Sequence, residues 1–219
     1  MSPDGQDSRT IMRLRFGVGA IGILLPVVLP LGNWIMDWTK SRTGVEVWPG
    51  SMSGSYYTST RDIFVGSLCA LGVFLIAYRF NPKQDLASTL AGFLALGVAF
   101  CPTAPSANAT AGQQLVGAVH LGFAGLLLFT LAGFCWAMGQ AQEFTGDGNK
   151  TVRFVCHAAG TLIPVFVVLA GLMSAAKIGV GMAFTPLYLF EALSVWAFGF
   201  AWLVAAFALA KKIGALAAG

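Results

Sequence analysis

Ionisable residues interrupt the apolar stretches of this sequence at three places, and their side chains are suited to catalysis or ligand binding. His120 and Glu191 lie inside apolar segments, and the adjacent Arg61 and Asp62 stand at the start of another. An ionisable side chain at such depth is costly unless it is neutral or paired, which makes it a functional candidate. Histidine suits general-base chemistry with a carboxylate to orient it, and arginine suits binding of an anionic or hydroxylated headgroup.

The segment that precedes Arg61 is rich in hydroxyl groups, from Ser51 to Thr60, and we expect it to cover these ionisable residues. The ligand-binding set predicted for an outward-facing polar pocket is Tyr56, Tyr57, Arg61, Asp62, His120 and Glu191. The candidate catalytic set is His120, Asp62 and Glu191.

Each of these residues also has a purely structural interpretation. Asp62 suits the first turn of a helix, where a carboxylate favours the positive end of the helix dipole. Arg61 suits an interfacial cation whose apolar stem lies along the protein while its charge reaches water. His120 and Glu191 could form a hydrogen-bonded pair that serves the fold alone. Both interpretations stay open at this stage.

Metal and cofactor chemistry is not expected. The four cysteines have unrelated spacings and form no CxxC pair, so we expect buried thiols that act as small apolar side chains. Cys135, Cys156 and His157 could be neighbours, but zinc requires four ligands, or three and a water. His157 and His120 are expected at opposite depths, which disfavours a haem held by two histidines.

Composition predicts the kind of secondary structure that positions these residues. Hydrophobic residues make up 57% of the 219 residues and charged residues only 10%, too few charges for the surface of a soluble domain. Long apolar runs predict transmembrane helices. We predict an all-α polytopic membrane protein, one bundle of six transmembrane helices between an N-terminal tail (1–15) and a C-terminal tail (213–219). The six spans cover residues of about 16–36, 63–78, 86–101, 115–138, 152–173 and 187–210.

The distribution of lysine and arginine predicts the orientation. With the N-terminus in the cytoplasm, nine of the 13 basic residues fall on the inner side and four on the outer side. Cytoplasmic segments carry the excess of Lys and Arg, so both termini are expected inside. No dense basic stripe is present, so the net charge of +4 does not indicate a nucleic-acid partner. We expect an integral protein of the bacterial inner membrane, with membrane lipid and a further membrane protein as candidate partners.

The stretch Ser53-Gly-Ser-Tyr-Tyr-Thr-Ser-Thr-Arg-Asp-Ile-Phe-Val-Gly, followed by an apolar run that ends at Tyr78, resembles a group of uncharacterised bacterial membrane proteins. The six-span plan with a polar first outer loop is also similar to the Frag/DRAM/Sfk-like membrane proteins, which implies a role in lipid handling or membrane stress. Ceramidase-like hydrolases are a further comparison, but they hold zinc with three histidines, and this chain has two.

Three functional hypotheses follow. The leading one is a non-enzymatic membrane protein whose outward-facing polar pocket binds a lipid headgroup or a small amphiphile. The second is a membrane-embedded lipid hydrolase in which His120 acts as general base with Asp62 or Glu191. The third is an accessory subunit of a larger membrane complex. The first two differ in whether His120 lies within hydrogen-bond reach of a carboxylate.

Overall fold

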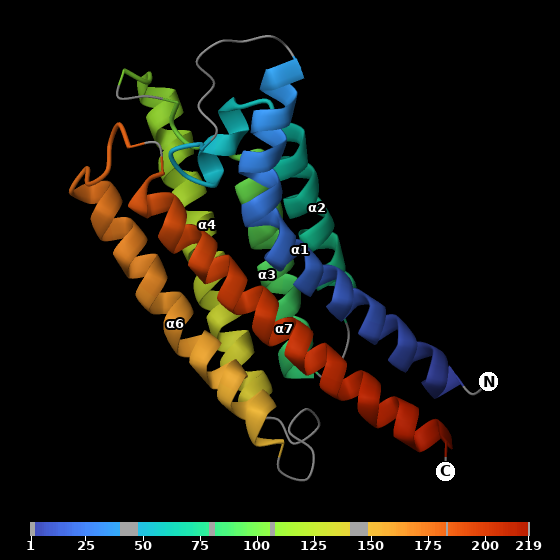
Figure 1. Ribbon diagram of the computed structural model, residues 1–219. Helices are drawn as coiled ribbons and strands as arrows, with labels where there is room; N and C mark the ends of the chain where they lie inside the picture. Colours follow the sequence, from blue (N-terminus) through green and yellow to red (C-terminus); the bar gives the residue numbers. More distant parts are fainter. Residues whose placement is uncertain are drawn as a thin grey trace.

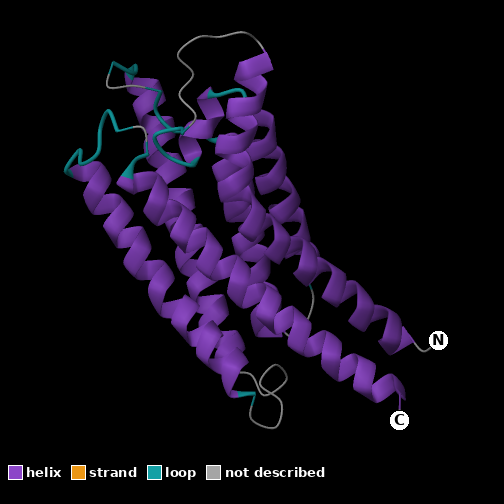
Figure 2. Ribbon diagram, viewed as in Figure 1, coloured by secondary structure: helices purple, strands orange, loops and turns teal. Residues whose placement is uncertain are grey.

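The protein is all-helical in the computed structural model, which describes residues 3–39, 48–78, 82–105, 108–140, 149–182 and 184–218. Figure 2 shows helices joined by loops, with no strand in these ranges. The elements in Figure 1 are α1 (Pro3–Thr39), the 3₁₀ turn η1 (Ser53–Tyr57), α2 (Arg61–Ala77), α3 (Pro82–Phe100), α4 (Ala111–Gln140), α6 (Lys150–Ala175) and α7 (Pro186–Ala218).

Within the described residues, four helices are long and apolar enough to cross a membrane, which confirms the expected membrane class in part. These segments are Thr10–Asp37, Ala111–Gln140, Lys150–Ala175 and Pro186–Lys211. At 1.5 Å per residue each exceeds a hydrocarbon core of about 30 Å. The other two expected spans fall on α2 and α3, which have 17 and 19 residues. Helix α1 also includes residues 3–15, which the sequence assigned to a tail, and α7 extends to Ala218.

The helices pack as a closed ring in which each contacts the next along the chain. Helix α1 contacts α2, α2 contacts α3, α3 contacts α4, α4 contacts α6, and α6 contacts α7. Contact between α7 and α1 closes the ring. Both termini lie at one end of the bundle, and the loop that holds η1 lies at the other (Figure 1).

Glycine allows the helix backbones to approach closely at two crossings. A Cβ atom on Gly22 of α1 would lie 2.9 Å from the Cα of Gly199 in α7. A Cβ atom on Gly92 of α3 would lie 2.6 Å from the carbonyl oxygen of Gly72 in α2. Small residues serve this purpose in membranes, where helices gain little from hydrophobic association and depend on close packing.

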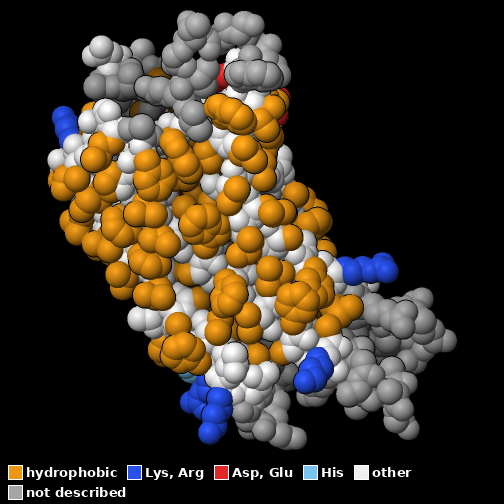
Figure 3. Space-filling model, in the orientation of Figure 1, with side chains coloured by type: hydrophobic (Ala, Val, Ile, Leu, Met, Phe, Trp, Pro, Cys, Tyr) orange, Lys and Arg blue, Asp and Glu red, His pale blue; other side chains and the backbone are white. Residues whose placement is uncertain are grey.

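The outer surface of the bundle is apolar between its ends. Figure 3 shows hydrophobic side chains over most of one face, with Lys and Arg toward the ends. Phe93, Leu121, Phe154 and Phe207 are each more than 60% exposed. Large exposed apolar side chains on every part of a soluble surface would favour aggregation, whereas in a membrane they face lipid.

Arg15 is buried, although the sequence placed it in the N-terminal tail. Its exposed fraction is 0%. Its Nε donates a hydrogen bond to the Tyr78 hydroxyl at 3.1 Å, and its Nη2 donates to the same oxygen. The guanidinium carbon lies 5.2 Å from the centroid of the Tyr78 ring. Helix α1 is therefore held to the end of α2 by a buried cation, which a tail would not provide.

Candidate functional site

Glu191 fixes the loop between α1 and α2 onto the start of α7. Its Oε2 accepts a hydrogen bond from the Met52 backbone N–H at 2.6 Å. Thr185 adds a second link, because its hydroxyl donates to the Gly50 carbonyl at 2.6 Å and accepts from the Tyr188 N–H at 3.1 Å. A carboxylate that accepts a backbone N–H satisfies a donor in the partly buried loop. Glu191 therefore has a clear structural task.

Ser59 attaches the same loop to α1. Its N–H donates to the Asn33 Oδ1 at 3.3 Å, and its hydroxyl donates to the Asp37 Oδ1 at 2.5 Å. The loop is thus bonded to both α1 and α7, which are adjacent in the ring. The loop covers the end of this helix pair with polar groups.

His120 satisfies the end of α3. Its Nδ1 lies 2.5 Å from the Cys101 carbonyl, so Nδ1 carries the proton and donates it. Pro102 has no N–H, so the Val98 carbonyl four residues earlier lacks its helical donor at the same end of α3. The side chain is only 1% exposed, and its Nε2 has no hydrogen-bond partner in the structure as described.

The three candidate catalytic residues occupy separate local environments. The hydrogen bond of His120 goes to Cys101 and that of Glu191 goes to Met52. Asp62 lies exposed in the first turn of α2, the position at which a carboxylate favours the helix dipole. Within the described ranges no hydrogen bond joins His120 to either carboxylate.

The other predicted binding residues form an exposed aromatic and cationic strip. The Arg61 Nη2 donates to the Tyr56 hydroxyl at 3.3 Å, and its guanidinium carbon lies 4.6 Å from the Tyr56 ring centroid. The Tyr56 and Tyr57 rings meet edge to face at 5.3 Å, and the Tyr57 hydroxyl donates to the Thr103 carbonyl at 2.5 Å. Desolvation, with a smaller effect of Tyr56, raises the pKa of the Tyr57 phenol above its usual value of 10.0, while Arg61 opposes the shift.

Tyr57 and Thr103 also border a small hollow at the same end of the bundle. Its volume is about 160 Å³, and its other walls come from Pro102 and from the first turns of α4. The hollow is too small for the lipid chain of an amphiphile, since binding pockets for drug-sized ligands measure about 300 Å³ or more. The outward-facing polar pocket expected from the sequence therefore stays a prediction, with these residues at the surface beside a small hollow.

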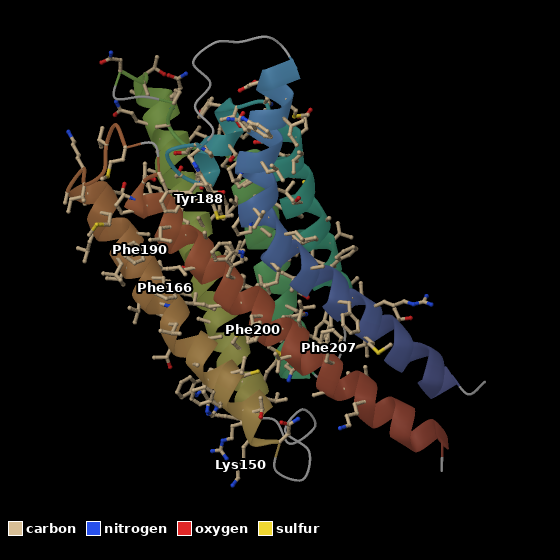
Figure 4. All side chains as sticks on the ribbon, viewed as in Figure 1. Lys150, Phe166, Tyr188, Phe190, Phe200 and Phe207 are labelled. Carbon is tan, nitrogen blue, oxygen red and sulfur yellow. The ribbon has the colours of Figure 1, made fainter. Side chains whose placement is uncertain are left out.

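An apolar groove lies near the loop, between α1 and α7, and we call it the α1–α7 groove. Its volume is about 320 Å³. Its walls are almost entirely apolar and include Pro26, Pro30, Trp34, Trp48, Tyr188 and Trp196. Figure 4 places Tyr188 at the end of α7 that lies under the loop.

Two prolines and two aromatic donors explain why this groove is apolar. Pro30 has no N–H, so the Pro26 carbonyl has lost its helical donor. The Tyr188 hydroxyl supplies one at 2.8 Å, and the Trp196 Nε1 donates to the Ile23 carbonyl at 3.0 Å. These bonds turn the polar atoms of the aromatic side chains toward α1, and their rings remain as apolar walls.

Trp48 closes the loop end of the α1–α7 groove. Its ring packs edge to face against Tyr188 at 5.4 Å and against Phe184 at 4.8 Å. The groove thus begins beneath a polar loop and continues along apolar helix surface. A molecule that fits both parts has a polar head and an apolar body.

Metal ligands do not gather in the described part of the chain: it contains no group of three or more His, Cys, Asp or Glu side chains that could hold an ion. Cys135 and Cys156 are both fully buried, on α4 and α6. His157 stacks on Trp136 with ring centroids 4.6 Å apart.

The fold and composition define a helical membrane protein. The sequence matches no family model and no curated protein, and its structure matches no solved structure. The resemblance to uncharacterised bacterial membrane proteins therefore stays a prediction, and function rests on the geometry of the chain itself.

Parts of the signal for the α1–α7 groove are present in the sequence, although the groove was not predicted from it. Pro26 and Pro30 stand one turn apart, and Trp34 and Trp48 suit an aromatic belt at the membrane interface. Tyr188 lies three residues before the conspicuous Glu191. The missing information was the pairing of α1 with α7, which no local pattern contains.

Proposed function

We propose that this protein binds a membrane amphiphile, with the apolar body of the ligand in the α1–α7 groove and its headgroup beside the loop. The observation that carries the proposal is the apolar groove of about 320 Å³ beneath the polar loop that Glu191 and Thr185 hold. Ligand sites are concave and mostly apolar, with a few polar groups that fix orientation. Leu31 and Trp34 at its edge are each 48% exposed, so the groove opens toward the lipid-facing surface.

The strip of Tyr56, Tyr57 and Arg61, with the adjacent Asp62, is the part of the predicted site that reaches the surface and is open to a headgroup. Arg61 lies over the Tyr56 ring, a placement that holds the guanidinium at the surface. His120 and Glu191 have internal hydrogen-bond partners and are assigned positioning roles. If wild type and Arg61→Ala retain lipid equally, Arg61 does not bind the headgroup. The proposal would then rest on the groove alone.

A lipid hydrolase with His120 as general base has less support. A general base needs a lone pair within reach of the substrate proton. The Nδ1 of His120 donates to Cys101, and the opposite ring nitrogen is buried with the rest of the side chain. An accessory-subunit role stays a prediction without a specific contact to favour it.

We further propose six membrane spans with both termini in the cytoplasm, in a bacterial inner membrane as the resemblance implies. At 1.5 Å per residue, α2 and α3 measure about 26 and 29 Å, close to the hydrocarbon thickness. The common end of the two termini also carries Lys150 (Figures 1 and 4), as expected for the positive cytoplasmic side. C-terminal fusions test the orientation: a fluorescent reporter should be active, and an active C-terminal alkaline phosphatase would contradict it.

A groove-filling substitution tests the ligand proposal. Val27 lines the groove and is 47% exposed, so Val27→Trp can fill the space without disrupting the core. Leu24 lies on the same helix, is 56% exposed and is absent from the groove, which makes Leu24→Trp the matched control. Displacing about two methylene groups costs about 1.6 kcal/mol, or about a tenfold loss of affinity.

Native mass spectrometry of the three purified proteins measures bound lipid. Wild type and Leu24→Trp should retain an amphiphile through detergent exchange, and Val27→Trp should retain about tenfold less. Equal retention by all three proteins would exclude the groove as the binding site.

A further inference from the structure

A second groove lies at the opposite end of the bundle, between α4 and α6. We call it the α4–α6 groove. Its volume is about 620 Å³, and it is open along one side. Its walls include Trp136, Lys150, Arg153, Phe154, His157 and Leu162. Lys150 marks this end of α6 in Figure 4, far along the bundle from Tyr188 and the α1–α7 groove.

The residues of α6 in this groove form one continuous face. Lys150, Phe154, His157 and Thr161 follow one another at intervals of three or four residues, which places them along one side of a helix. Arg153 stands beside Phe154, so two cations occur within the first turn. The face therefore passes from charged at the end of the helix to apolar nearer its middle.

The charged part of this face is exposed and has no acidic partner in the described residues. Lys150 and Arg153 are both exposed, and no carboxylate within the described residues forms an ion pair with either. Two neighbouring cations attract phosphate, which arginine binds with two parallel hydrogen bonds and lysine as a point charge. Charge complementarity thus selects an anionic occupant.

The apolar part of the face is also exposed. Phe154 is 74% exposed, Trp136 is 44% exposed and Leu162 is 43% exposed. The floor is fixed, because the His157 ring stacks on Trp136 at 4.6 Å and presses on α4 where Gly139 has no side chain. A freely soluble anion would leave this apolar surface empty, whereas an acyl chain would cover it.

We propose that the α4–α6 groove binds an anionic phospholipid, with its phosphate at Lys150 and Arg153 and an acyl chain along Phe154, Trp136 and Leu162. The site uses other helices and the opposite end of the bundle from the α1–α7 groove. It therefore stands independently of the proposed function. Membrane proteins recognise acidic lipids through basic residues placed beside an apolar helix face, and this groove has that arrangement.

Competition between two phospholipids with identical acyl chains tests this proposal. Native mass spectrometry compares retention of phosphatidylglycerol and phosphatidylcholine by wild type and by Lys150→Gln/Arg153→Gln. Each basic residue near an acidic lipid changes its binding about fivefold, so the two together should make wild type prefer phosphatidylglycerol by about 25-fold. The double variant should lose that preference.

The matched control removes the same charge elsewhere at the same end. Arg13 and Lys211 are exposed on α1 and α7, outside the α4–α6 groove. Arg13→Gln/Lys211→Gln should keep the preference for phosphatidylglycerol, and so should Val27→Trp. Both double variants change only exposed side chains, and unchanged thermal unfolding by circular dichroism verifies that they fold.

Three results would overturn the site. Wild type could retain the two lipids equally, the two double variants could lose the preference to the same extent, or the variant at Lys150 and Arg153 could keep it. Inorganic phosphate at millimolar concentration separates the lipid from a free anion: it should leave phosphatidylglycerol bound. Full displacement by phosphate alone would contradict the role of the acyl chain.

Discussion

Removing the Tyr188 hydroxyl tests the link between the α1 prolines and α7. Tyr188 is 1% exposed, and its hydroxyl donates to the Pro26 carbonyl at 2.8 Å. Tyr188→Phe keeps the ring but leaves that carbonyl without a donor, because Pro30 cannot provide one. A buried acceptor left without its partner costs about 1 to 2 kcal/mol. We expect the free energy of unfolding in detergent micelles, measured by circular dichroism, to fall by about this amount.

A double-mutant cycle with Pro30→Ala isolates the cause. Alanine restores an N–H at position 30, so the Pro26 carbonyl regains a helical donor. Tyr188→Phe should then cost less than about 0.5 kcal/mol in the Pro30→Ala background. If the cost of Tyr188→Phe is the same in both backgrounds, the proline-freed carbonyl is not what the hydroxyl serves, and the reasoning fails.

Two further substitutions test the loop and a helix crossing. Glu191→Leu removes the acceptor of the Met52 N–H, so hydrogen exchange in residues 50–57 should quicken about tenfold. Glu191→Gln keeps an acceptor and should leave the exchange rate nearly unchanged. Equal exchange rates in the two variants would refute the role of Glu191 in holding the loop. Gly92→Leu forces a side chain against the Gly72 carbonyl and should cost at least about 2 kcal/mol of unfolding free energy, while Gly66→Leu, which meets nothing within 4 Å, should cost little. Similar losses would refute the close crossing.

The helices could be predicted from the sequence because their signal is local. Residues 115–138 and 152–173 are apolar runs, and they lie within α4 and α6. Helix ends were less predictable. The charges before residue 16 looked like a tail, although the helix continues there and Arg15 is buried against Tyr78. These two residues are 63 positions apart, so no local pattern could join them.

The candidate site was predictable by residue but not by partner. Glu191 and His120 are conspicuous ionisable residues, and both make hydrogen bonds that hold the fold. The partner of Glu191 is a backbone N–H in a loop whose position depends on tertiary packing. Pro102 marks the end of α3 in the sequence, but nothing local indicates that the partner of His120 is the Cys101 carbonyl. The grooves depend on which helices are neighbours, and the ring order follows only from the packed structure.

An experimental structure of the protein in lipid nanodiscs tests directly whether the α1–α7 groove holds an amphiphile. We predict continuous density for one apolar chain between Trp34 and Trp196, with its polar end beside the loop that Glu191 holds. A groove closed by direct packing of α1 on α7, or one empty while lipids are ordered elsewhere around the bundle, would contradict the proposed function.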